Sequence, residues 1–213
     1  MTVTLISITP DAEHVIASMG RIAHRSESNR HDHIITDAVF IKKLIGWGHE
    51  SVLEHASATI ELSGVSRALS HQIVRHRLVS YTQESQRYVN QDQFDCVMPP
   101  SIRDNPDAVA DFNGAMRRAQ DGYNYLVALG IPPEDARFVL PNACCTRIGI
   151  TANFRQWRHM ITLRCDAHAQ WEIREAFRAI LVALNSHAPA VFSDLYAKFI
   201  TSETERNPDG RQT

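Results

Sequence analysis

At 213 residues, with 44% hydrophobic and 22% charged side chains, the chain has the composition of one globular domain with a sizeable core. A formal net charge of -2 argues against an extended surface for nucleic acid polymers, and no apolar run approaches the roughly 18–20 residues of a membrane-spanning helix. The first ten residues lack the features of a secretory signal and the four cysteines lack C-x-x-C spacing, so we expect a cytoplasmic protein with reduced thiols.

The N-terminal half contains clear periodic patterns. Residues 3–8 are apolar and β-branched, which predicts a strand, and residues 34–45 carry an apolar stripe that predicts a helix. Ser51 to Glu54 has the spacing of a capping box and predicts the start of a short helix. Residues 57–63 alternate as a half-buried strand does, and Ser66 is expected to cap a helix that runs to His76.

The C-terminal half is predicted to be mainly helical. Residues 107–129 form the clearest helical pattern, which Gly130 ends, and the prolines at 132–133 start the next turn. Phe154, Trp157 and Ile161 indicate another helix, and Asp166 is expected to cap a long one.

These elements do not follow a regular βαβ alternation. We therefore expect an α/β chain of the α+β type, with an antiparallel-rich sheet flanked by helices. One domain is expected over residues 1–200, followed over 201–213 by a polar tail that is expected to fray.

The segment from Arg75 to Tyr88 concentrates basic and polar side chains. Only Lys42, Lys43 and Lys198 are lysines, so the positive charge here is carried by arginine, whose planar fork fits phosphates. Gln72, Arg75 and His76 would share one helix face, and Ser85 and Arg87 follow in a short loop. The residue types alone leave two interpretations open, a pocket for a phosphate and a base or an arginine-rich surface turn.

The order of these residues resembles the signature of the flavin-dependent thymidylate synthases. Arg-His-Arg at 75–77 is followed after seven residues by Ser85 and then by Gln-Arg-Tyr. Further segments resemble the same family in order, and they lie at residues 48–55, 136–141 and 153–173.

The resemblance implies an enzyme that methylates dUMP to dTMP. The methylene group would come from 5,10-methylenetetrahydrofolate, the reduction to methyl from FADH2, and NADPH would reduce the flavin again. The resemblance also implies a homotetramer with active sites shared between subunits.

The resemblance assigns FAD contacts to Ser51, Arg75, His76, Arg77, Gln83, Asn153, Phe154, Arg155 and His159. A helix N-terminus capped by Ser51 could receive a pyrophosphate, and Arg155 and His159, four apart, could reach one ligand. The alternatives are ordinary capping by Ser51 and Glu54 and a solvated polar face for Arg155 and His159. His49 is expected near the flavin and the folate.

The resemblance assigns nucleotide contacts to Gln72, Ile73, Val74, Arg75, Gln83, Glu84, Ser85, Gln86, Arg87, Arg137 and Arg164. Arg164 matches the family's activating arginine and is the predicted catalytic residue, which would stabilise the uracil anion; the alternative is a helix cap or a partner for Asp166. Ser85 is assigned to binding, because no base is evident to activate it as a nucleophile. Some family members carry Asn-Glu in place of Thr82-Gln83, so either Gln83 or Glu84 makes the flavin or ribose contact.

Two other functions are compatible with parts of the sequence. A metal-dependent hydrolase could use His49, Glu50, Glu54 and His55, with His31, Asp32 and His33, although a spacing of six does not place two histidines on one helix face. A nonenzymatic RNA-binding module could use the segment from Arg75 to Arg87, with Tyr81 and Tyr88 as stacking platforms.

Overall fold

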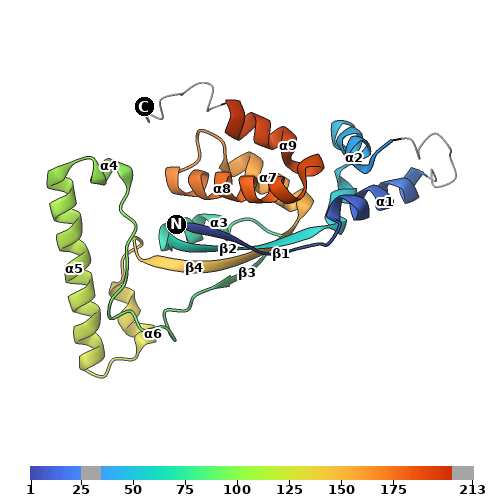
Figure 1. Cartoon of the computed structure of the whole chain (residues 1–213). Coiled ribbons are helices and arrows are strands. Elements are labelled where there is room, and N and C mark those ends of the chain that lie inside the picture. Colours follow the sequence, from blue (N-terminus) through green and yellow to red (C-terminus); the bar gives the residue numbers. More distant parts are fainter. Residues whose placement is uncertain (25–34, 203–213) are drawn as a thin grey trace. The chain divides into compact units, whose positions relative to one another are not determined.

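The computed structural model describes residues 1–24 and 35–202 (Figure 1). Contacts within the chain divide it into two compact units. The first unit comprises Met1–Thr2, Leu62–Arg75 and Thr82–Gly149. The second unit comprises Val3–Glu61, His76–Tyr81 and Ile150–Thr213, apart from the residues outside the described ranges. Each unit is therefore assembled from segments that are distant in the sequence.

A four-stranded antiparallel sheet confirms the mixed helix and strand class. Its strands, in spatial order, are β1 (Thr2–Ile8), β2 (Ser57–Ser66), β4 (Cys145–Asn153) and β3 (Ser80–Gln83). The structure confirms both predicted strands, and Ala58, Ile60 and Leu62 of β2 are buried as their alternation predicts. The strands β3 and β4 were not predicted.

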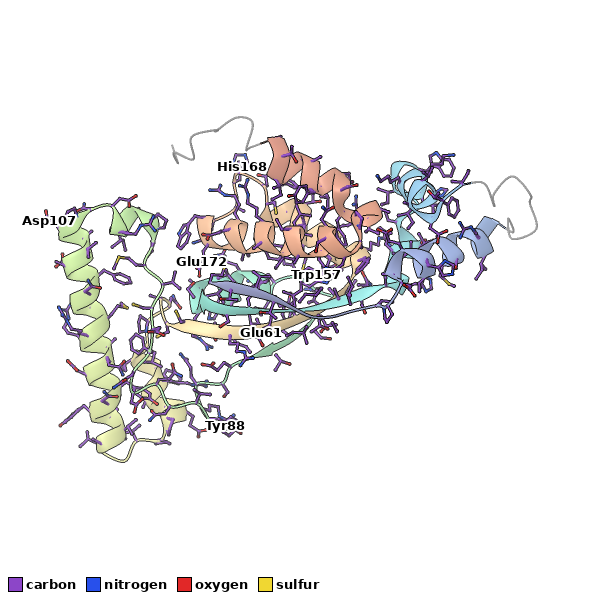
Figure 2. The ribbon with its side chains drawn as sticks, in the orientation of Figure 1. Glu61, Tyr88, Asp107, Trp157, His168 and Glu172 are labelled. Atoms are coloured by element: carbon purple, nitrogen blue, oxygen red, sulfur yellow. The ribbon has the colours of Figure 1, made fainter. Side chains whose placement is uncertain are left out.

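Several helices pack together in the second unit. They are α1 (Ala12–His24), α2 (Asp37–Gly46), the 3-10 helix η3 (Glu50–His55), α7 (Phe154–Arg164), α8 (Trp171–His187), α9 (Pro189–Tyr196) and the π-helix η5 (Ala197–Thr201). Helix α7 contacts η3, α8 and α9, and α2 contacts α1 and α9. Figure 2 labels Trp157 on α7, whose indole Nε1 donates to the Ala58 carbonyl of β2 at 3.1 Å. This fully buried side chain joins α7 to the strand.

The first unit contains the longest helix. Its helices are α3 (Arg67–Ile73), α4 (Pro100–Arg103), α5 (Pro106–Ala128), α6 (Pro133–Ala136) and the 3-10 helix η4 (Arg137–Val139). Helix α5, the long green helix of Figure 1, confirms the predicted helix over 107–129. Gly130 follows it with a φ of 84°, a conformation that glycine adopts without a steric penalty. Helix α5 contacts α4, α6 and η4.

Three predicted helix ends are wrong. Ser66 caps α3 as expected, accepting from the Leu69 amide at 3.0 Å, but α3 ends at Ile73. Gln72, Arg75 and His76 therefore do not share a helix face.

The other two errors concern caps. Ser51 lies inside η3, whose N-cap position is His49, so it does not cap a helix. Asp166 accepts from the His168 amide, and α8 is capped by Gln170 instead. Asp166 therefore stabilises the turn before α8 rather than the start of the helix.

The predicted helix over 34–45 is confirmed as α2, which begins after the cap residue Thr36. Ile34, most of the polar tail and His31, Asp32 and His33 lie outside the described residues. Within the described ranges, no helix has both the length and the apolar character needed to cross a membrane.

Candidate active site

A pocket of about 700 Å³ opens in the second unit beside the start of α7. It is lined by Glu50, Glu54, Leu78, Asn153, Arg155, Gln156, Arg158, His159 and Thr162. Three predicted cofactor residues, Asn153, Arg155 and His159, therefore lie around one cavity. The prediction that Arg155 and His159 share a helix face is confirmed, because both line this pocket from α7.

The junction between β4 and α7 fixes these side chains. Strand β4 ends at Asn153 and α7 begins at the next residue, with no intervening loop. The Asn153 side chain caps α7 by accepting from the Gln156 amide at 2.8 Å. Arg155, in the first turn of α7, donates to Glu54 of η3 at 2.6 Å. Glu54 is thus an ion-pair partner of Arg155 rather than a capping residue.

Arg158 is a pocket residue that the sequence reasoning missed. Its guanidinium is buried and donates to both carboxylate oxygens of Asp194, each at 2.7 Å, and to the Val191 carbonyl. Burial acts to raise the pKa of Asp194, but the hydrogen bonds and the charge of Arg158, together with backbone hydrogen bonds, lower that pKa overall. Among the described residues, the Arg158 Nε atom has no hydrogen-bond partner.

The predicted catalytic arginine lies in a second cluster of the same unit. Arg164, the last residue of α7, donates from Nε to Nε2 of His76 at 2.8 Å. The rings of His76 and His159 meet edge to face, with centroids 6.1 Å apart. Tyr81 donates its hydroxyl to the His76 carbonyl at 3.3 Å. Arg164 thus has a defined contact to His76, which neither the helix-cap nor the Asp166 interpretation predicted.

His76 is held in its neutral form. Burial, together with Arg164 and His159, lowers its pKa to about 4. A neutral ring that accepts at Nε2 carries its proton on Nδ1, so the Arg164 contact fixes the tautomer. Burial raises the pKa of Tyr81 to about 12, although Arg164 acts to lower it. Arg164 therefore carries its charge beside two groups that are neutral at pH 7, His76 and Tyr81.

We expect His76 to make the protein acid-sensitive. An unfolded histidine protonates near its ordinary pKa of 6.5, whereas folded His76 resists protonation until about pH 4. The unfolded state therefore binds more protons in this window, so stability is full above about pH 6.5 and falls toward pH 4. Urea titrations from pH 7 to 4 should show the wild type losing on the order of 3 kcal/mol more than His76→Gln. Parallel pH profiles for the two proteins would contradict the burial of a neutral histidine.

The remaining predicted flavin residues differ in their exposure to solvent. Arg75 and Arg77 are exposed and flank the buried His76. Leu78, at the pocket edge, is 86% exposed and has a φ of 61°, a conformation that costs a non-glycine residue free energy. Phe154 is fully buried against Phe192, so its side chain belongs to the core.

The predicted nucleotide residues lie almost entirely in the first unit. Gln83, at the end of β3, donates from Nε2 to Ser70 at 3.0 Å and to Thr146 at 3.1 Å. The Glu84 amide donates to the Arg147 carbonyl at 2.8 Å, and Glu84 lines a separate pocket of about 320 Å³. Gln83 is thus fixed by α3 and β4, whereas Glu84 faces an open cavity.

Arg87 and Arg137 converge on one acidic residue. Arg87 forms an ion pair with the Glu134 carboxylate at 3.2 Å, and Arg137 donates to the Glu134 carbonyl at 3.0 Å. The Ser85 hydroxyl accepts from the Arg87 amide at 3.2 Å, which shapes the turn after β3. Gln86 is buried, and its Nε2 has no partner among the described residues. Ile73 is fully buried and Val74 is exposed.

The described residues do not support the metal-site alternative, and they support only one stacking platform of the RNA-binding alternative, the 83% exposed Tyr88. In the described ranges, no three His, Cys, Asp or Glu side chains gather as a metal site, and Glu54 pairs with Arg155. Tyr81 is half-buried with its hydroxyl bonded to the backbone, so it is not an open stacking platform for RNA.

Comparison with known proteins identifies the family. Residues 4–190 match the family model described as "Thymidylate synthase complementing protein". The chain is 43% identical over 200 residues to a flavin-dependent thymidylate synthase of Geobacter sulfurreducens, covering 91% of this chain and 86% of that protein. It is 38% identical over 201 residues to the Mycolicibacterium gilvum protein of the same name (87% and 80% covered) and 37% identical over 211 residues to that of Clostridium tetani (89% and 84% covered). The resemblance found in the arginine-rich motif thus extends over most of the molecule, and the chain belongs to the family of flavin-dependent thymidylate synthases.

Proposed function

We propose that this chain is a FAD-dependent thymidylate synthase that methylates dUMP to dTMP. The one-carbon donor is 5,10-methylenetetrahydrofolate and the reductant is NADPH. The observation that carries this proposal is the family match over residues 4–190, which contains the arginine-rich motif and the segment of α7 that ends in Arg164.

The second-unit pocket suits the phosphates and polar edges of FAD. An eleven-residue helix, α7, starts at the pocket, and helix N-termini favour pyrophosphate groups. Arg155 adds a guanidinium, and Asn153 and His159 add groups for hydrogen bonds. The Nε of the buried Arg158 makes no hydrogen bond among the described residues and lies 3.9 Å from the Glu50 carboxylate, so it is a further donor at this pocket. The anion-binding helix is therefore α7, capped by Asn153, rather than one capped by Ser51.

The other predicted FAD contacts remain part of the proposal. Arg75, His76 and Arg77 would contact the flavin from the segment after α3, with Ser51, Gln83 and the backbone of Phe154. His49 would lie near the flavin and the folate. When bound, FAD supplies the reducing equivalents that complete the methyl group.

Arg164 would activate the pyrimidine. Carbon 5 of neutral uracil is a weak nucleophile, and loss of the N3 proton spreads negative charge toward that carbon. An arginine with a pKa above about 12 is not the base, but its fixed charge stabilises the anion in a site that excludes water. His76, by accepting from Nε, holds the guanidinium in place without neutralising it.

The nucleotide would be held chiefly by side chains of the first unit. Arg87 and Arg137 are proposed to bind the phosphate, because two guanidinium groups converge there and share only Glu134 among the contacts described above. The polar side chains of Gln72, Arg75, Gln83, Glu84, Ser85 and Gln86 are proposed to contact the ribose, phosphate and base. Ile73 and Val74 would contribute backbone groups.

We further propose a cytoplasmic homotetramer. In it, the flavin residues of one subunit would meet the nucleotide residues of another, as active sites shared between subunits require. The domain is proposed to span residues 1–200, with the polar tail outside it.

The decisive experiment is an anaerobic single turnover. The purified protein is loaded with FAD and reduced by NADPH. It should then convert dUMP and 5,10-methylenetetrahydrofolate to dTMP, and the visible absorbance of the oxidised flavin should return as dTMP forms. Omission of dUMP is the control. A protein that binds neither FAD nor dUMP, or that oxidises its flavin without forming dTMP, would refute the proposal.

A further inference from the structure

Two cysteines of the first unit face each other directly before β4. Cys96 and Cys144 form an isolated antiparallel bridge outside the named strands. The residues that flank this pair are joined by two backbone hydrogen bonds of 2.8 Å each, from the Val97 amide to the Ala143 carbonyl and from the Cys145 amide to the Asp95 carbonyl. The two cysteines lie between these bonds, which is the non-hydrogen-bonded position of an antiparallel pair.

This position brings the two side chains together. At a non-hydrogen-bonded position the Cα atoms are roughly 4.5 Å apart, and the side chains lie closer than at the alternating, hydrogen-bonded position. A separation of roughly 4.5 Å lies within the range of about 4.4–6.8 Å that disulfide bonds span. Cys145 follows Cys144 directly, and side chains alternate between the two faces of an extended chain, so Cys145 points to the other face. The backbone therefore pairs Cys96 with Cys144 and not with Cys145.

The two thiols differ in their access to solvent. Cys144 is fully buried, whereas Cys96 is partly exposed. Burial raises the pKa of the Cys144 thiol to about 12, although the Arg67 guanidinium acts to lower it. Burial and the Asp95 carboxylate raise the pKa of the Cys96 thiol. Because the thiolate is the reacting species, both thiols react slowly at pH 7, and an oxidant from solution reaches Cys96 first.

We propose that Cys96 and Cys144 are an oxidation site, at which a small-molecule disulfide converts the two thiols into an intramolecular disulfide bond. The Cys96 thiolate attacks one sulfur of the oxidant, expels the other sulfur as a thiolate and forms a mixed disulfide. The Cys144 thiolate then attacks the Cys96 sulfur and expels the second thiolate. Two protein thiols are oxidised, and the oxidant is reduced to two thiols, which take up the two cysteine protons.

The bond would join the two ends of the segment 97–143. This segment holds α4, α5, α6 and η4, and α5 contacts the other three. Arg137, one of the proposed nucleotide residues, lies within it. A disulfide that closes a long loop restricts the unfolded chain strongly, so oxidation should stabilise this part of the molecule. The inference is independent of the proposed function, because the bond forms without flavin or nucleotide.

Oxidised glutathione is the probe for this site in the purified full-length protein. After incubation and removal of the reagent, two of the four thiols should be lost when free thiols are counted in denaturant. Digestion and mass spectrometry should find one pair of peptides, joined through Cys96 and Cys144. The initial rate of thiol loss should be on the order of 10-fold higher at pH 8 than at pH 7, because more thiolate is present. The oxidised protein should melt on the order of 10 °C above the reduced protein.

The matched control is Cys145→Ser, which removes the adjacent thiol on the other face. It should keep the bridge and the rise in melting temperature, whereas Cys96→Ser should lose both. A wild-type protein that keeps all four thiols, or that carries only glutathione on Cys96, would overturn the inference. A bridge that joins Cys145 to either of the other two cysteines would overturn it as well.

Discussion

Arg164→Ala is expected to reduce dTMP formation by on the order of 100- to 1000-fold while the protein still binds FAD. The guanidinium would stabilise the uracil anion, and the alanine side chain cannot supply its positive charge. The flavin pocket is lined by other residues of α7, so its affinity should change little. Single-turnover dTMP yield and flavin absorbance, measured on the same sample, separate the two effects.

Controls for Arg164→Ala must separate the loss of the activating charge from the loss of stability at the buried His76. Without Arg164, His76 Nε2 loses its donor, which costs on the order of 1–3 kcal/mol of stability. Arg103→Ala removes an exposed arginine and should keep full turnover. Added guanidinium ion should partly restore turnover to Arg164→Ala, as expected when only a charged group is missing. A turnover rate near that of the wild type would show that Arg164 is not the activating residue.

Trp157→Ala is expected to cost about 3–5 kcal/mol of unfolding free energy, the largest effect on stability. Trp157 is fully buried, packs near Phe177 at a centroid distance of 6.5 Å and bonds to the Ala58 carbonyl. Its loss leaves a cavity beneath α7, the helix that carries Arg155, His159 and Arg164. Urea unfolding followed by fluorescence or circular dichroism measures the effect.

Trp157→Phe separates packing from the hydrogen bond. Phenylalanine keeps most of the aromatic surface but cannot donate to Ala58, so the expected loss is smaller, near the roughly 1–3 kcal/mol of an unpaired buried acceptor. FAD affinity should fall more in Trp157→Ala than in Trp157→Phe. Unfolding free energies within about 1 kcal/mol of the wild type for the alanine variant would contradict the role of Trp157.

The fold could be predicted from the sequence where one periodic pattern dominates. The helix α5 and the strands β1 and β2 have long, regular patterns, and all three were predicted. Strand β3 has only four residues, too few for alternation to stand out. In β4, Ile148 and Ile150 do alternate in the buried positions, but Gly149 between them weakens the pattern.

Predictions for the site depended on the residues that the family motifs specify, and other residues were missed, even inside a matching segment. Asn153, Arg155 and His159 belong to a segment that resembles the family, and they line one pocket. Arg158 gave no sequence signal, because its burial depends on a partner far along the chain. Asp194 is 36 residues from Arg158. Long-range packing of this kind cannot be deduced from spacing.

The direct passage from β4 into α7 makes the chemistry depend on chain length at that point. Deleting one residue from β4 would reverse the faces of the residues before the gap, exposing Ile148 and Ile150. If the strand kept its pairing instead, α7 would start one residue early and turn by about 100° about its axis. His159 and Arg164 would then swing away from His76 together. With no loop to absorb such a change, this junction should tolerate substitutions at its exposed positions far better than insertions or deletions.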